Sequence, residues 1–117
     1  DDIRLVAATP PQVTVVEEDH TMALPQAFTL SQNFPNPLNS ETVIRFALPE
    51  GGEVELAVYN LAGQLVSKLV QGQREAGSYT VRWDGRDERG KELASGVYLY
   101  RLQAGAQGQA RKLVLVR

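Results

Sequence analysis

The sequence predicts an all-β protein, an antiparallel β-sandwich of about seven strands. Short runs from residue 28 onward alternate between apolar and polar side chains, which is the pattern of half-buried strands. Turn-forming glycine, proline and asparagine separate these runs at regular intervals, and no amphipathic helix of useful length is present. Because the connections are short, neighbouring strands are expected to be antiparallel.

The first strands are expected between residues 28 and 48. "FTLSQ" is β-prone, and "FPNPLN" then imposes a rigid non-helical turn through Pro35, Asn36 and Pro37. "TVIRFALP" alternates, so one face of this strand is buried and the other, with Arg45, is exposed. The buried side chains would be Ile44, Phe46 and Leu48.

Two strands are predicted on either side of "NLAG". "EVELAVYN" alternates, with the glutamates outward and the aliphatic residues inward, and Gly63 can supply the positive φ that the connection needs. "QLVSKLVQG" would also fit one helical turn, but its short length and flanking glycines favour a strand. The inward residues of the first strand would be Val54, Leu56 and Val58.

The last three strands carry four of the eight aromatic residues of the chain. "GSYTVRWDG" and "SGVYLYRLQAG" each alternate, "AQGQ" is expected to turn the chain, and "ARKLVLVR" is the closing strand. The inward residues would be Tyr79, Val81 and Trp83 in the first run and Tyr98, Tyr100 and Leu102 in the second. The core predicted for the whole sandwich contains Ile44, Phe46, Leu56, Val58, Val81, Trp83 and Tyr98.

Residues 1–27 differ from the remainder. "QVTVVE", residues 12–17, is β-prone, but Pro10 and Pro11 limit any strand here to an edge. We interpret this region as a linker or the tail of a preceding domain that adds, at most, an edge strand. The chain opens on "DDIRL" without a basic segment, which is unlike a signal peptide.

The composition excludes several classes of function. A net charge of −2 gives no basic surface for nucleic acid or anionic lipid, and no apolar run is long enough to span a bilayer. The absence of cysteine removes disulfides, thiolate catalysis and cysteine zinc sites. His20 is the single histidine and is interpreted as a solvated loop residue. No cofactor and no metal site are predicted.

The segment "DGRDERGKELAS", residues 84–95 and called the acidic loop below, carries Asp84, Asp87 and Glu88. An EF-hand calcium loop needs oxygen ligands at alternate positions and a glutamate at the twelfth. In this segment the third position is Arg86 and the twelfth is Ser95. We therefore favour a turn in which the aspartates accept hydrogen bonds from nearby backbone N–H groups. A simpler calcium site built on Asp84 and Asp87 stays open.

Catalysis is not predicted. Glu53 and Glu55 lie on one strand face, which is normally the solvent side of a sheet rather than a glycosidase cleft. No catalytic triad or phosphate-binding loop is present. Trp83, Tyr98 and Tyr100 would suit a sugar-stacking platform, but their alternation with polar residues favours the core. Tyr59 is out of phase with its inward neighbours and is the aromatic residue expected to be exposed.

Five features taken in order resemble a known family. They are the Pro35–Pro37 turn, "VYNLAGQLV", the Trp83-Asp84-Gly85 step, "ASGVYLYRL", and a basic closing strand that contains Lys112. Residues 28–117 resemble the C-terminal sorting domain of cargo proteins of the type IX (Por) secretion system. This domain is similar to the immunoglobulin-like domain of the flagellar hook-capping protein. One departure is Leu38, where many members carry phenylalanine.

The resemblance implies an immunoglobulin-like β-sandwich that follows a cargo domain in a larger exported protein. Such domains are recognised by the outer-membrane secretion machinery and are commonly removed by a surface protease. The cargo is then released or attached to a lipopolysaccharide anchor. The implied route is through the periplasm to the cell surface or medium. The sorting-signal residues carried over are Gly96, Tyr98, Lys112, Leu113, Val114, Leu115, Val116 and Arg117.

A physical argument accompanies this assignment. A closing strand whose basic end is unpaired would offer backbone groups for strand addition by a receptor, whereas Arg111, Lys112 and Arg117 would also protect an edge strand from aggregation. The expected protein is a non-catalytic monomer. The alternative is an immunoglobulin-like accessory domain of an extracellular glycosidase that packs on its enzyme or binds polysaccharide.

Overall fold

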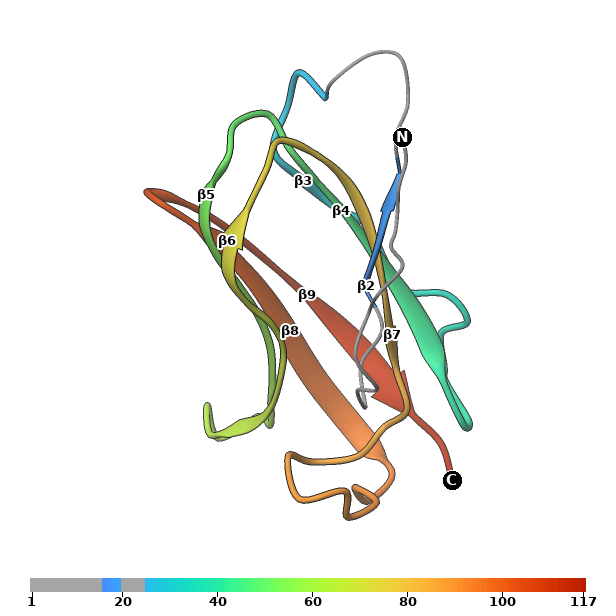
Figure 1. Cartoon of the computed structure of the whole chain (residues 1–117). Helices are drawn as coiled ribbons and strands as arrows, with labels where there is room; N and C mark the ends of the chain where they lie inside the picture. Colours follow the sequence, from blue (N-terminus) through green and yellow to red (C-terminus); the bar gives the residue numbers. More distant parts are fainter. Residues whose placement is uncertain (1–15, 20–24) are drawn as a thin grey trace.

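The computed structural model describes residues 16–19 and 25–117, which form two four-stranded antiparallel sheets that face each other (Figure 1). The first sheet has the order β2-β7-β4-β3, and the second has the order β6-β5-β8-β9. The strands are β2 (Val16–Asp19), β3 (Thr29–Leu30), β4 (Thr42–Leu48), β5 (Gly52–Tyr59), β6 (Leu65–Arg74), β7 (Gly77–Trp83), β8 (Gly96–Ala104) and β9 (Gln107–Leu115). The prediction of seven antiparallel strands after residue 28 is confirmed.

The core lies between the sheets and is built from the side chains that the alternation placed inward. The burial of β4 and β7 alternates strictly, and the ring of Phe46 stacks on that of Tyr79 with centroids 5.1 Å apart. All seven residues predicted for the core are buried: Ile44, Phe46, Leu56, Val58, Val81, Trp83 and Tyr98. Leu38 is fully buried in the same cluster, so leucine fills the position where many relatives carry phenylalanine.

β6 is a strand, as predicted, but its pairing with β5 is irregular. The register shifts between Leu56 and Ala57 and again between Val58 and Tyr59, which marks two β-bulges. Because a bulge adds one residue to a strand, Leu69 and Val70 are both buried although they are consecutive. This irregularity explains why the segment did not alternate cleanly in the sequence.

The turn before β9 differs from the prediction. The chain reverses at Gly105-Ala106, with Ala104 opposite Gln107, so β9 begins at Gln107 rather than after an "AQGQ" turn. A two-residue connection between paired strands is the tightest hairpin, and Gly105 supplies its positive φ of 60°. The polar residues at 107–109 are therefore part of the strand.

β2 lies before residue 28 and pairs with β7 at the edge of the first sheet, Val16 opposite Val81 and Asp19 opposite Ser78. Of the strand expected over 12–17, residues 12–15 lie outside the described part of the chain, and so does His20. None of the described residues forms a helix with the length and hydropathy needed to span a bilayer.

Candidate functional site

The residues carried over as a sorting signal come together on one hairpin, formed by β8 and β9. Gly96 lies opposite Leu115 and Tyr98 opposite Leu113, so the two parts of the signal are in register although they are far apart in sequence. Leu113 and Leu115 are fully buried, whereas Lys112 is exposed. Val114 is half-buried on the outer face, where it lies opposite Val97.

Gly96 and Tyr98 contribute to the hairpin in different ways. Gly96 has a φ of 158°, a conformation that residues with a Cβ rarely adopt, and it starts β8 directly after the acidic loop. The Tyr98 ring is buried, and its hydroxyl donates a 2.7 Å hydrogen bond to the Ala94 carbonyl of that loop. Tyr98 thus ties the start of β8 to the loop before it.

The end of β9 is paired on both sides, which corrects the prediction of an unpaired end. Its outer edge meets the segment of residues 32–38, called the proline loop here. The Leu38 N–H donates to the Val114 carbonyl at 2.8 Å, and the Val116 N–H donates to the Leu38 carbonyl at 2.9 Å. The Val114 N–H donates to Asn36 Oδ1 at 3.0 Å. The proline loop therefore occupies the place that strand addition at this end would need.

The proline loop is fixed by a buried polar network that sequence reasoning missed. Asn33 and Thr42 are buried, and Asn33 Nδ2 donates to Thr42 Oγ1 at 3.0 Å and to the Pro35 carbonyl at 3.1 Å. The Tyr100 hydroxyl donates to the Ser31 carbonyl at 2.7 Å and accepts from the Asn33 N–H at 2.8 Å. Buried polar groups are stable only when paired in this way. No local pattern in the sequence marks Asn33 and Thr42 as a pair.

Burial also changes the acidity of the Tyr100 hydroxyl. Loss of solvation raises the pKa of this group above its usual value of 10.0, since the phenolate is the form that burial disfavours. The backbone hydrogen bond from Asn33 and the positive charge of Arg111 act in the opposite direction, and desolvation is the larger effect. The Tyr100 hydroxyl therefore stays protonated, which lets it donate to the Ser31 carbonyl while it accepts from the Asn33 N–H.

Two of the three basic side chains at the end of the chain are engaged in hydrogen bonds. Arg111 donates through Nε to the Leu30 carbonyl, which joins β9 to β3 of the opposite sheet. Arg117 donates through Nε to the Leu93 carbonyl at 3.0 Å and through Nη2 to the Gly85 carbonyl. Among the described residues the ammonium of Lys112 has no hydrogen-bond or ion-pair partner. Of these three basic residues, Lys112 is thus the one whose charged group is not engaged by the described residues.

The acidic loop is a set of turns, as predicted. Asp87 Oδ1 accepts from the N–H groups of Arg89 at 2.9 Å and Lys91 at 3.0 Å, and Asp84 Oδ1 accepts from the Arg86 N–H at 3.2 Å. The hydrogen bond from the Lys91 N–H is the largest of the effects that lower the pKa of Asp87 below its usual 3.8. In the described part of the chain no three acidic or histidine side chains are grouped as metal ligands would be.

Glu88 has a different role from the two aspartates. Its Oε2 accepts from the Lys68 N–H at 2.7 Å, and its own N–H donates to the Val66 carbonyl at 3.1 Å. Both partners lie on β6, the edge strand of the second sheet. Glu88 therefore covers the bulged part of that edge with hydrogen bonds that a neighbouring strand would otherwise make.

The aromatic residues do not form a sugar-binding platform. Trp83, Tyr98 and Tyr100 are exposed by 2%, 8% and 0%, so their rings lie in the core and not on a surface. The indole N–H of Trp83 donates to the Arg86 carbonyl at 3.1 Å, which satisfies its only polar atom. Tyr59 lies on the outer face of the second sheet, as its phase in the sequence indicated, but it is half-buried rather than exposed.

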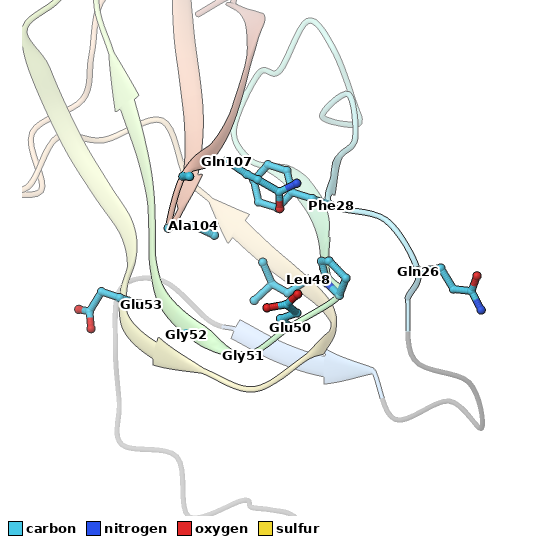
Figure 2. Close-up of a pocket in the computed structure, with 12 residues that line it drawn as sticks. Gln26, Phe28, Leu48, Glu50, Gly51, Gly52, Glu53, Ala104 and Gln107 are labelled. Atoms are coloured by element: carbon cyan, nitrogen blue, oxygen red, sulfur yellow. The ribbon is translucent and has the colours of Figure 1, made fainter.

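A hollow of about 510 Å³ lies at the opposite end of the sandwich, between the β4–β5 and β8–β9 turns (Figure 2). Its lining includes Phe28, Leu48, Glu50 and Gln107, and its carboxylates belong to Glu50 and Glu53. The Glu53 side chain points away from Glu50 and Leu48 in Figure 2. The two carboxylates do not converge on one point, so this hollow lacks the acid pair that glycoside hydrolysis requires.

Fold and contacts together define a class of protein, an immunoglobulin-like β-sandwich domain. The FlgD Ig-like domain family matches residues 36–108, and the chain belongs to this family. A comparison with curated proteins gives no match.

Three solved structures are similar to the chain. PorZ of Porphyromonas gingivalis, described as an essential bacterial surface component of the type-IX secretion system, is 19% identical with a TM-score of 0.51 over 79% of this chain and 12% of that one. Dimeric latent PorU of the same organism is 21% identical with a TM-score of 0.57, over 95% of this chain and 10% of PorU. FlgD of P. aeruginosa is 29% identical with a TM-score of 0.50, over 63% of this chain and 57% of FlgD. The chain thus spans about a tenth of the two Por proteins and just over half of FlgD.

Proposed function

We propose that this domain is a non-catalytic C-terminal sorting module, which directs an exported cargo protein through type IX secretion to the cell surface or the medium. Residues 28–117 would be the sorting domain, to which β2 adds an edge strand, and the rest of residues 1–27 would be the linker to a cargo domain or the tail of that domain. The partners would be the outer-membrane secretion machinery and a surface protease that removes the domain. The domain would act as a monomer and without a cofactor.

The observation that carries the proposal is the register of the β8–β9 hairpin. Gly96 and Tyr98 pair with Leu115 and Leu113, so residues matching two separate parts of the family's signal form one structural unit. The unit is held by the proline loop and the acidic loop, through Leu38 and through Arg117. A receptor would therefore meet a preformed surface rather than a flexible tail.

The similar structures add support of a second kind. PorZ is described as a surface component of type-IX secretion, and the chain matches only 12% of it, which is the share expected of one domain in a larger protein. PorU matches over 95% of this chain but over only 10% of its own length. A domain of this fold therefore occurs as a module of larger proteins, as a sorting module would.

The proposal is tested by transfer of the domain. Because β2 pairs with β7, residues 1–117 are fused to the C-terminus of a neutral periplasmic reporter in a type IX-competent host. We expect the reporter at the cell surface, measured by protease accessibility of intact cells. Deletion of Leu113–Arg117 should abolish export, but this deletion also removes the buried Leu113 and Leu115 and so tests folding as well.

Lys112→Ala is the sharper variant, because Lys112 is exposed and makes no contact that the fold needs. We expect it to reduce surface display, whereas Arg45→Ala, the loss of an exposed cation on β4, leaves display unchanged. A folded fusion that stays in the periplasm would show that sorting is the wrong function, and would favour an accessory domain that packs on an enzyme.

A further inference from the structure

The outer face of the β6-β5-β8-β9 sheet carries an apolar patch at the end where β9 finishes. The cross-strand register places Leu65 opposite Tyr59, Tyr59 opposite Leu99, and Val97 opposite Val114. Residues paired in this way have Cβ atoms about 5 Å apart, so these five side chains form one continuous area, called the outer patch here. Leu65 is 44% exposed, and the other four are half-buried and reach solvent.

The neighbouring rows of the same face, and β7 of the other sheet, do not share this composition. Further along the same face, the next rows pair Glu55 with Gln71 and Gln103, and Glu53 with Gln73, which is the usual polar surface of a solvated sheet. On the outer face of the other sheet, the corresponding positions of β7 are Ser78, Thr80 and Arg82. The outer patch is thus a local feature and not a general property of this fold's surface.

Three cations border the outer patch. Lys68 and Arg101 lie opposite Ala57 on its two neighbouring strands, next to the row that contains Tyr59. Lys112 lies opposite Leu99, on the side of the outer patch formed by β9. All three side chains are exposed, and among the described residues no ion pair or hydrogen bond engages their charged groups. Elsewhere Arg86 of the acidic loop pairs with Glu92 at 3.3 Å, and Arg82 of β7 pairs with Glu41 at 3.9 Å.

We propose that the outer patch is the docking surface for a partner protein that presents an apolar area bordered by carboxylates. A partner that covers the patch removes water from Lys68, Arg101 and Lys112, and the cost of desolvating these cations is offset only by opposite charge. Under the proposed function, on which this inference rests, the partner is the receptor of the secretion machinery.

Two other occupants fit the surface less well. A second copy of the chain would bring the same patch, which is bordered by the same three cations, so it would not supply the opposite charge that offsets their desolvation. A lipid surface is bound by apolar side chains that reach into the membrane, but those of the outer patch lie within a flat sheet face. The most exposed apolar residues, Phe34 at 78% and Leu61 at 68%, are in loops outside the patch.

Site-specific photo-crosslinking of the reporter fusion of residues 1–117, in the type IX-competent host, tests the surface. A photoreactive phenylalanine analogue replaces Leu99 in one strain and, as the matched control, Thr80 on the outer face of the other sheet. We expect a protein adduct from position 99 and none from position 80. Arg101→Glu should lower the adduct yield by about tenfold, because it places like charges at the contact, whereas Arg45→Glu on β4 leaves the yield unchanged.

The outcomes separate this inference from the sorting function. An adduct at position 99 with lipopolysaccharide or with a second copy of the chain overturns the proposed partner. So does a yield that is insensitive to Arg101→Glu, or export without any adduct at position 99. If the fusion stays inside but position 99 still gives the charge-dependent protein adduct, the docking surface stands and the sorting function is wrong. Thermal unfolding of each variant establishes that it is folded.

Discussion

At the scale of single residues, the domain depends on a few buried polar atoms placed among apolar side chains. Asn33 and Thr42 are 2% and 0% exposed, and each finds a partner within the proline loop. Trp83 and Tyr100 bury large rings and still satisfy their polar atoms. Such pairings matter because an unsatisfied buried group costs about 1–3 kcal/mol, a large part of a small domain's stability.

Trp83→Ala should be strongly destabilising. Trp83 is 2% exposed in the core, so its removal leaves a cavity and loses its contacts, which typically costs about 3–5 kcal/mol. The free energy of unfolding from urea titration measures the effect. Trp83→Phe is the control and should cost less, since it keeps most of the apolar volume and loses the hydrogen bond to Arg86. A loss below about 1 kcal/mol for the alanine variant would contradict burial of the indole.

Gly85→Ala tests how the Trp83-Asp84-Gly85 step approaches the end of the chain. Gly85 has a φ of 73°, and a Cβ there would lie 2.9 Å from Arg117 Nη2 and 3.4 Å from Leu115 Cδ1. We expect a loss of more than the roughly 1–2 kcal/mol that the left-handed conformation alone costs. Gly90→Ala is the matched control, because Gly90 has a φ of 85° but open space around it. Equal losses for the two variants in urea unfolding would show that the contact with Arg117 is unimportant.

At the scale of elements, alternation predicted the strands because each strand buries one face. β4, β7 and β8 follow the period of two, and their inward residues were identified from the sequence. The bulges of β6 were not predictable, since a bulge depends on the register with β5. The contacts that hold the end of β9 were also hidden, because Asn36 and Val114 are 78 residues apart in the chain. Pairing of a side chain with a distant backbone leaves no local signature.

The acidic loop should be indifferent to calcium. Asp84 and Asp87 already accept hydrogen bonds from backbone N–H groups, and Glu88 is engaged by the Lys68 N–H, so these oxygens have structural partners. A ligand that binds only the native state raises the melting temperature with its concentration. We therefore expect the same Tm in calcium and in chelator, measured by differential scanning fluorimetry. A calcium-dependent rise that disappears in Asp87→Ala would mean that the loop binds the ion.

At the scale of the whole molecule, the two ends of the sandwich differ. One end has open turns around a shallow hollow, whereas at the other the proline loop and the acidic loop hold the end of β9. The same loops cover parts of the edge strands of the second sheet, since Leu38 pairs with β9 and Glu88 with β6. Gln109 Oε1 of β9 in turn accepts from the Leu30 N–H of β3, and Arg111 of β9 donates to the Leu30 carbonyl. Exposed strand edges promote association, and this molecule covers much of its own.

Because the strand edges are covered, we expect the domain to be a monomer. Glu88→Ala is the variant that exposes the edge of β6. This change removes the acceptor of the Lys68 N–H on β6 and leaves a backbone donor free to pair with another chain. We expect the wild type to sediment as a single monomeric species and Glu88→Ala to remain folded but associate as its concentration rises. Glu50→Ala makes the same charge change in the exposed β4–β5 turn, where it removes no hydrogen bond to a strand edge, and should stay monomeric. Association of Glu50→Ala to the same extent would assign the effect to net charge, and a dimeric wild type would show that these loops do not protect the edges.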